Sequence, residues 1–412
     1  MLRKLLPAYL LTFVNVLGFT ILMPVFPFII ESYNAPDWVY GLMLTLYSAF
    51  QFIGSPYLGG LSDSLGRKPV LVISQIGTLL SWIIFFVALL FPEYSLFGIS
   101  LSLIIIGLSR ALDGITGGNT SVANAYVSDI TTRQEKSYIF GYLGGIAGIA
   151  MIIGPGIGGL TASTSLGFKG TILAAIGISI ITLITILLIK ESHPKEKRIP
   201  RSKFSLWKSI NIHARVQEVQ PKPIIKLLFT TKFFFSIMMA FYISTIVLFV
   251  IDLFKFNEQE LGTFLLVVGL FLSFNQAFVS RIIIRRIGEF KTLLVGLALS
   301  AIGLFCITLT DNFWLYISFY YVMNLGLSLS FPSFNALISI HANPQKQGAV
   351  MGISESITSF CNAVFPIIGA FLYGQMSFYF YYLVAALPVT AFIIAFIGYN
   401  HLKKSELDPK NA

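Results

Sequence analysis

Residues 59–69 read GGLSDSLGRKP and separate two long apolar stretches of the chain. A tight connection between two long helices needs a residue that tolerates unusual backbone angles, and Gly66 supplies it. Asp63 stands where it can cap a helix end or pair with a cation, while Arg67 and Lys68 add two positive charges. The pattern predicts a short charged loop between two membrane-spanning helices.

Outward from this loop, the chain is too apolar to be a soluble protein. It has 412 residues, of which 56% are hydrophobic and 11% are charged, and Phe alone numbers 38 against 18 acidic residues. A soluble protein usually carries about 25% charged residues. A soluble multi-domain enzyme is therefore excluded, and at about 20 apolar residues per crossing the length allows about a dozen spans.

The predicted fold class is an all-α polytopic membrane protein. Its 12 transmembrane helices form two pseudo-symmetric six-helix bundles. The predicted spans are the apolar stretches 5–30, 39–61, 69–91, 96–127, 138–161, 168–189, 227–250, 261–283, 292–309, 313–340, 348–373 and 378–399.

Lysines and arginines set the orientation, because cytoplasmic loops are enriched in them. With the amino terminus in the cytoplasm, 25 of the 28 basic residues fall inside, Lys169 and Lys255 fall outside, and Arg110 lies within the fourth span. Both termini are therefore predicted to be cytoplasmic. The net charge of +10 is explained without nucleic acid.

The chain divides into an amino-terminal bundle (1–189), a cytoplasmic linker (190–226) and a carboxy-terminal bundle (227–412) with a short tail. The linker carries ten basic and three acidic residues, and it is either a solvated connector or holds a short amphipathic helix near 204–212. A shift of 211 residues aligns Pro155 with Pro366 and Gly158 with Gly369, among other matches. Such duplication is typical of transporters that bind solute at the midplane between parallel halves.

Further motifs accompany residues 59–69. They are Asn15-x-x-Gly18 and Met23–Pro27 in the first span, Gly114–Gly118 and Ala123–Thr131 in the fourth, and Gly154–Gly159 in the fifth. Together they resemble the major facilitator superfamily, in particular its twelve-span drug:proton antiporter branch and the tetracycline-resistance-like group.

The resemblance implies roles for two groups of residues. One group forms a cytoplasmic latch that gates the transporter: Gly59, Asp63, Gly66, Arg67, Lys68, Asp129 and Arg133. The other group kinks the fifth span, as in exporters: Gly154, Pro155, Gly158 and Gly159. The alternative for this second group is ordinary small-residue packing between helices.

One position departs from the family pattern. Tetracycline-type members usually carry an aspartate in the first span, where this chain has Asn15. A neutral amide can hydrogen-bond a solute but cannot carry a proton. The sequence therefore argues against tetracycline as the solute and against proton coupling through the first span.

Ionisable residues inside the spans are the candidates for proton coupling, because charges at bilayer depth are costly and are retained for function. Asp113 lies three residues after Arg110, on the same helical face, and Glu355 lies in the eleventh span without a charged neighbour in sequence. We predict that Asp113 and Glu355 carry protons. The alternatives are a self-neutralising Arg110–Asp113 pair, an Arg110 that binds an anionic solute, and a Glu355 that stays hydrated.

Uncharged polar residues within the spans could line the same cavity or simply join helices. With Arg110, the predicted solute-binding residues are Asn15, Tyr47, Gln51, Asn275, Gln276, Asn324 and Asn362. The sequence contains no Gly-x-x-x-x-Gly-Lys-Ser/Thr loop and no His/Cys/Asp cluster at a span end. We therefore predict no cofactor, no metal site and no enzymatic activity.

These observations predict a proton-coupled secondary transporter of a small organic solute that works by alternating access, most simply an efflux antiporter for a drug or metabolite. The alternative is a proton symporter that imports an anionic or metal-chelating metabolite. The predicted partners are the solute, protons and the lipid bilayer, with no nucleic acid. We expect a monomer in the inner (plasma) membrane of a bacterium.

Overall fold

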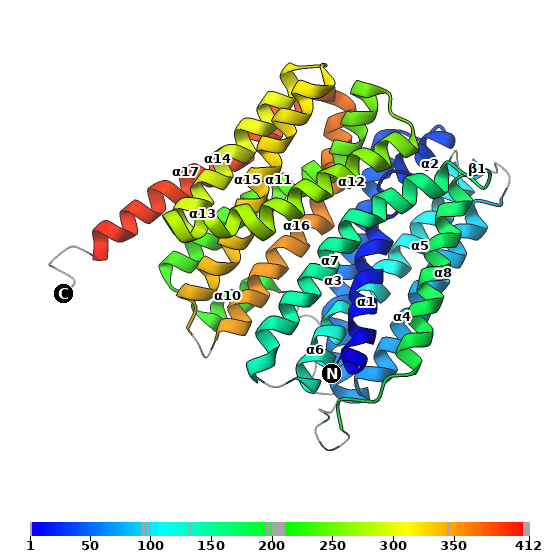
Figure 1. Ribbon diagram of the computed structural model, residues 1–412, viewed down its shortest axis with the longest axis horizontal. Helices are drawn as coiled ribbons and strands as arrows, with labels where there is room; N and C mark the ends of the chain where they lie inside the picture. Colours follow the sequence, from blue (N-terminus) through cyan, green and yellow to red (C-terminus); the bar gives the residue numbers. More distant parts are fainter. Residues whose placement is uncertain are drawn as a thin grey trace. The chain divides into compact units, whose positions relative to one another are not determined.

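A computed structural model describes residues 2–91, 95–96, 99–131, 133–194, 196, 198, 211–343 and 346–406, and some side chains within helices fall outside this description. Nearly all of the described chain is helical (Figure 1). The strands in the described residues are β1 (Ser95–Leu96) and β2 (Ile99–Ser100), which pair antiparallel. The all-α prediction is confirmed apart from this hairpin.

Each of the first six predicted spans is helical, and two of them are interrupted. The elements are α1 (Leu2–Thr20), α2 (Phe26–Ser32), α3 (Asp37–Leu65), α4 (Arg67–Ala88), α5 (Leu101–Gly117), α6 (Thr120–Ile130), α7 (Arg133–Ala162) and α8 (Phe168–Leu187). The first span breaks at residues 21–25, where Pro24 cannot donate a backbone hydrogen bond. The fourth breaks after Gly117, at Gly118 and Asn119.

The last six predicted spans are helical as well. After the short α10 (Ile212–Val219), the elements are α11 (Pro223–Phe254), α12 (Glu258–Phe274), η3 (Asn275–Val279), α13 (Ser280–Ile287), α14 (Glu289–Cys306), η4 (Ile307–Leu309), α15 (Phe313–His341), α16 (Gln347–Met376), η5 (Ser377–Tyr379) and α17 (Phe380–Glu406). The eighth span contains η3, a π-helical segment, and such segments often mark functional sites. The amphipathic helix expected near 204–212 lies almost wholly outside the described residues.

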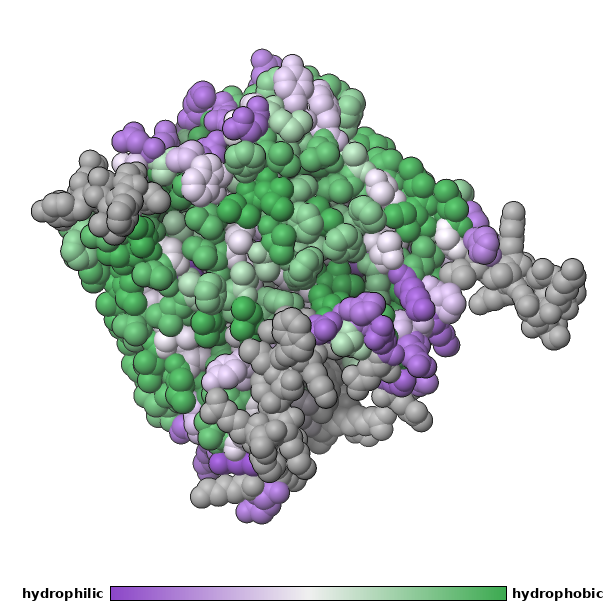
Figure 2. Space-filling view, turned by 180° about the vertical axis from the view of Figure 1, so that it is seen from behind, coloured by the Kyte–Doolittle hydropathy of each residue, from purple (hydrophilic) through white to green (hydrophobic). Residues whose placement is uncertain are grey.

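The exposed surface of these helices is apolar. By length and composition alone, eight helical segments of the described chain could cross a membrane, and one of them, 349–401, comprises both α16 and α17. Large apolar side chains stand outward, for example Leu108 (65% exposed) and Ile397 (62% exposed). Figure 2 shows apolar residues over most of the displayed face, with hydrophilic residues gathered toward its margins. Such a surface needs lipid around it.

The structure separates into two compact units, residues 1–210 with 255–267, and residues 211–254 with 268–412. Within each unit the helices have equivalent neighbours. The first unit pairs α1 with α7, α4 with α5 and α4 with α8, and the second pairs α11 with α16, α14 with α15 and α14 with α17. Pro155 and Pro366, which the 211-residue shift aligns, both lie inside long helices, α7 and α16. The internal repeat of the sequence therefore corresponds to a repeated arrangement of helices.

Candidate functional site

A buried ion pair occupies the interior of the first unit. Arg110 Nη1 lies 3.2 Å from Asp113 Oδ2, and the two side chains are 3% and 7% exposed. The guanidinium of Arg110 also lies over the ring of Trp82, 4.6 Å from its centroid, and 5.1 Å from that of Phe85. Both aromatic residues come from α4. A carboxylate on one side and aromatic faces on the other together hold the cation away from lipid.

Tyr47 and Gln51 of α3 lie close to this pair. Gln51 Nε2 donates to the Tyr47 hydroxyl at 3.2 Å, and Tyr47 lies near enough to Asp113 and Arg110 to interact electrostatically. A Cβ at Gly114 would overlap the Tyr47 carbonyl, so α3 and α5 can only approach this closely because residue 114 is glycine. The structure thus places Tyr47 and Gln51 next to the Arg110–Asp113 pair that the sequence predicted.

Asn15 takes part in a chain of amide contacts between helices. Its Nδ2 donates to Asn119 Oδ1 at 2.5 Å, and Asn119 Nδ2 donates to Ser74 Oγ at 3.0 Å. Asn119 is fully buried at the break between α5 and α6. The amide of Asn15 therefore joins α1 to this break, and solute binding by Asn15 stays a prediction.

A second interior ion pair lies in the second unit, between α11 and α16. Lys232 Nζ donates to Ser354 Oγ at 2.7 Å and lies 3.2 Å from Glu355 Oε1. The lysine side chain is 9% exposed, whereas that of Glu355 is 64% exposed. Glu355, which has no charged neighbour in the sequence, therefore has one in space. Lys232, which we counted among the cytoplasmic charges, is buried within α11.

The remaining polar candidates all lie in the second unit. Asn275 is fully buried in η3, where its Oδ1 accepts from the Tyr321 hydroxyl at 3.0 Å. Asn324 is also buried and donates to the Val268 carbonyl at 3.3 Å. Gln276 is exposed and Asn362 is half-buried. Asn275 and Asn324 thus join helices in this structure, and solute contact by any of the four stays a prediction.

The loop of residues 59–69 is organised around Arg67. Its Nη1 lies 2.6 Å from Asp63 Oδ1, and its Nε lies 3.1 Å from Asp129 Oδ2 at the end of α6. Gly66 has φ +105°, a conformation that favours glycine, so the turn requires this residue. Gly59 faces Ser121 of α6. Asp63, Arg67 and Asp129, which the family resemblance placed in one latch, are in direct contact.

Glu191, which the sequence analysis did not single out, completes this network. Its carboxylate accepts from the backbone N–H groups of Arg67 at 2.9 Å and Lys68 at 3.2 Å, at the start of α4. A carboxylate at a helix N-terminus satisfies orphan donors and complements the helix dipole. Lys68 Nζ in turn donates to the Leu187 carbonyl at 2.8 Å. The side chain of Arg133 lies outside the described residues.

The glycines of α7 provide close contacts with neighbouring helices. A Cβ at Gly154 would overlap the Thr20 hydroxyl, and one at Gly158 would overlap the Ile21 carbonyl, both at the end of α1. The backbone of Gly159 lies against Gly262 of α12. Pro155 lies inside the helix between these contacts. Small-residue packing is therefore present, and a directional role for this segment stays a prediction.

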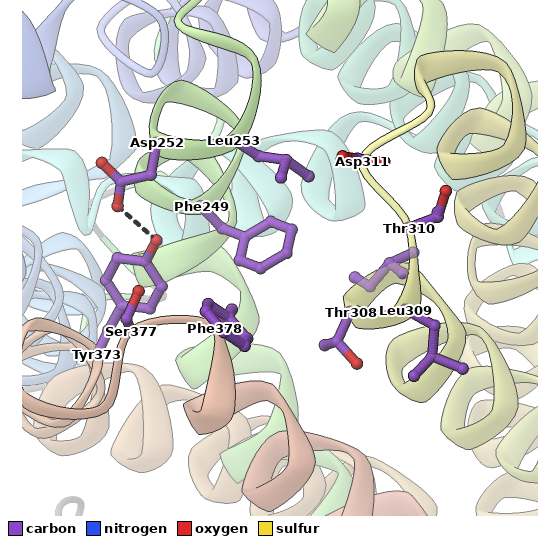
Figure 3. A pocket seen from close by; sticks show the side chains of 11 residues that line it. Phe249, Asp252, Leu253, Thr308, Leu309, Thr310, Asp311, Tyr373, Ser377 and Phe378 are labelled. Carbon is purple, nitrogen blue, oxygen red and sulfur yellow. Dashed lines mark hydrogen bonds between the residues drawn. The ribbon is translucent and has the colours of Figure 1, made fainter.

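An open cavity of about 450 Å³ lies at the end of α11 in the second unit. Figure 3 shows Phe249 and Leu253 on one wall and the segment from Thr308 to Asp311 on the other. Asp252 accepts a hydrogen bond of 2.6 Å from the Tyr373 hydroxyl at its edge. The cavity contains none of the residues that the sequence nominated.

Long apolar helices in a repeated arrangement, with a buried cation paired to a carboxylate in each unit, define an integral membrane transporter scaffold. Comparison with known proteins identifies the family: the chain matches the Major Facilitator Superfamily at residues 8–362 and 286–412 and belongs to it. It is a transporter of this superfamily and not an enzyme, as predicted.

Relatives agree with this assignment. The class H tetracycline resistance protein of Pasteurella multocida is 27% identical over 384 residues, which cover 90% of this chain and 89% of the relative. The class C protein of Escherichia coli is 28% identical over 364 residues, 87% of each chain. The resemblance to tetracycline-resistance proteins is thus confirmed.

Solved structures share the fold. A bacterial homolog of the human lysosomal transporter Spinster, in an inward-facing and unoccupied conformation, has a TM-score of 0.76 at 14% identity over 96% of each chain. The human organic anion transporter TETRAN has a TM-score of 0.71 at 20% identity and covers 95% of this chain and 99% of its own. Identities this low establish the fold alone.

Sequence reasoning missed Lys232 because it counted this residue as a cytoplasmic charge although it lies inside the predicted span 227–250. It missed Glu191 because the partners of this carboxylate, the backbone N–H groups of Arg67 and Lys68, are more than a hundred residues away in the chain. The available signal for Lys232 was a lysine inside an apolar stretch, between Thr231 and Phe233. The sequence signal for Asn119 was weaker: it is a polar residue directly after the Gly117-Gly118 pair.

Proposed function

We propose that this transporter exports a small organic solute, a drug or metabolite, in exchange for protons by alternating access. Proton uptake would occur at Glu355, with Asp113 as the second carrier. The observation that carries the proposal is Glu355 itself, an exposed carboxylate within an apolar helix, held by the buried Lys232. A carboxylate at such a position can exchange its proton while the rest of the helix stays dry.

Two further observations support export. Gly154, Pro155 and Gly158 in α7 form the segment that resembles the exporter motif, and the matched relatives are tetracycline resistance proteins. The network of Asp63, Arg67 and Asp129 supports a latch that is released during the cycle. The inner membrane of a bacterium, cytoplasmic termini and a monomeric state belong to the same proposal.

A second candidate is proton-coupled import of an anionic or metal-chelating metabolite. It is favoured by Arg110, whose Nε is buried without a hydrogen-bond partner among the described residues. Asn15 favours it too, because it stands where tetracycline-type members place an acid. Growth of a deletion strain on a panel of drugs and in iron-limited media would show which class of solute the protein transports.

Membrane vesicles with imposed proton gradients of either sign test the proposal. Antiport predicts that solute moves opposite to the proton flow, and movement in the same direction would instead establish the importer. Glu355→Gln should abolish uphill transport and spare solute exchange. Asp252→Asn, which neutralises an exposed carboxylate of the same unit, is the matched control and should pump normally. Uphill transport by Glu355→Gln would remove this residue from the coupling role.

A further inference from the structure

The cavity at the end of α11 combines acidic and aromatic side chains, and the proposed transport mechanism makes no use of it (Figure 3). Of the eleven described residues that line it, two are acidic and none is basic. Its volume of about 450 Å³ falls in the range of sites that hold small molecules. All of the lining residues belong to the second unit. The cavity is therefore a candidate site in its own right.

The two carboxylates of the cavity come from different elements and have no counter-charge. Asp252 lies near the end of α11 and Asp311 in the turn between η4 and α15, and Figure 3 shows them on opposite sides of the cavity. Both side chains are exposed, and neither forms an ion pair with a described residue. The hydroxyl of Tyr373, which donates to Asp252, is a neutral partner. Two negative charges without a counter-charge in one concave space attract cations.

The remaining walls of the cavity favour an organic cation over a metal ion. Three aromatic rings line it, those of Phe249, Tyr373 and Phe378, and the face of such a ring attracts ammonium groups. The ring of Phe249 is held in place by Tyr381, with the ring centroids 4.7 Å apart. Leu253 adds apolar surface that a hydrated metal ion cannot use. The described residues also contain no group of three or more His, Cys, Asp or Glu side chains that could hold a metal.

The backbone of Ser377 in the cavity wall has an unfavourable conformation. This residue is the C-cap of α16 and has φ +52°, a region in which a side chain is crowded. The turn that it makes ends α16 and leads directly into Phe378. Backbone conformations of this kind are concentrated at ligand-binding sites, where the surrounding structure holds them. The backbone of the wall thus points to a ligand independently of the charges.

We propose that this cavity binds an organic ammonium ion with an aromatic or alkyl body, at a second site that is separate from the transport pathway. The ammonium group lies between Asp252 and Asp311, and the apolar body lies against Phe249 and Phe378. The orientation predicted from the lysines and arginines places this end of α11 outside the cytoplasm, so the ligand arrives from the outer side. Pumping does not require the ligand, and Asp252→Asn therefore remains a control for uphill transport.

Equilibrium dialysis of the purified full-length protein in dodecyl maltoside against tritiated benzyltrimethylammonium tests the proposal. The probe should bind saturably, and benzenesulfonate, which carries the opposite charge on the same ring, should not compete. Asp311→Asn should weaken binding about two- to fivefold, the effect of one exposed opposite charge. Phe378→Leu should weaken it by a similar factor of about two to five through the lost ring face. Glu258→Gln is the matched control, because this carboxylate at the start of α12 does not line the cavity, and it should bind the probe like the parent protein.

Several results would overturn the site. They are the absence of saturable binding, an Asp311→Asn affinity equal to that of the parent protein, and an equally large loss in Glu258→Gln, which would reveal only a general surface-charge effect. Unchanged affinity in Phe378→Leu would overturn the aromatic contact. A lipid headgroup carries the same ammonium chemistry, so displacement of the probe by phosphatidylcholine in mixed micelles would overturn the assignment of a ligand from the aqueous phase. Dialysis requires no transport, so failure of the vesicle assay would reject the proposed function and leave the binding result intact.

Discussion

Replacing Asp113 by Asn should destabilise the first unit more than replacing Arg110 by Met. Both residues are almost fully buried and lie 3.2 Å apart on α5. Arginine cannot lose its proton in a protein, so Asp113→Asn leaves a permanent buried cation without its counter-charge. Arg110→Met leaves a carboxyl group that can take up a proton and become neutral.

The structure sets the size of the difference. Removing one partner of a buried ion pair costs about 3–5 kcal/mol when the remaining charge cannot be neutralised. The contact of Arg110 with Trp82 persists in Asp113→Asn, so it cancels from the comparison with the parent protein. For Arg110→Met the expected cost is about 1–3 kcal/mol, the range for a buried polar group that loses its partner.

Unfolding in mixed detergent micelles measures these free energies for the parent, the two single variants and the double variant. The double variant removes both charges and should be more stable than the sum of the single effects, by about 1–3 kcal/mol. Equal losses in both single variants, or additive losses in the double variant, would refute the reasoning. A stable double variant that still pumps uphill would in addition show that Asp113 carries no coupled proton.

Three more predictions follow from the contacts. Gly158→Ala should lower the free energy of unfolding because its methyl group meets the Ile21 carbonyl, whereas Gly144→Ala in the same helix, with open space at its Cβ, should be neutral or slightly stabilising. Asp63→Asn should slow turnover in the vesicle assay with little change in solute affinity, and a large affinity loss with normal cycling would mean that this loop is not a latch. Glu191→Ala, which removes both acceptor oxygens, should cost about 0.5–2 kcal/mol through the lost cap of α4, measured by the same unfolding assay, and no change would mean that the cap does not contribute.

Hydrophobic length alone predicted where the helices lie, because every span needs about 20 apolar residues and few charges. The breaks were harder to predict. Pro24 marks the interruption of the first span in the sequence, but the break at Gly118 and Asn119 depends on Asn119 reaching Ser74 of another helix. The π-helical segment at Asn275 likewise has no local sequence signal. These features arise from contacts between helices that are distant in sequence.

The sequence predicted those ion pairs whose two members are close together in the chain. Arg110 and Asp113, three residues apart on one helix, form the pair that helical periodicity predicts. Asp63 and Arg67, four residues apart, pair across the turn at Gly66. Lys232 and Glu355 are separated by more than a hundred residues. Their pairing follows from the packing of α11 on α16, which hydropathy does not reveal.

The two ion pairs also differ in how they respond to movement, because one lies within a single helix and the other joins two helices. Arg110 and Asp113 share one helix, so any rigid motion of α5 carries both residues together and leaves their 3.2 Å contact unchanged. Lys232 and Glu355 belong to different helices, so a shift of α16 against α11 would change their 3.2 Å contact. A longer contact weakens the electrostatic attraction between the ammonium and carboxylate groups. Of the two pairs, the Lys232–Glu355 contact is therefore the one that a movement between helices can alter, whereas Arg110 and Asp113 form a fixed pair beside Trp82.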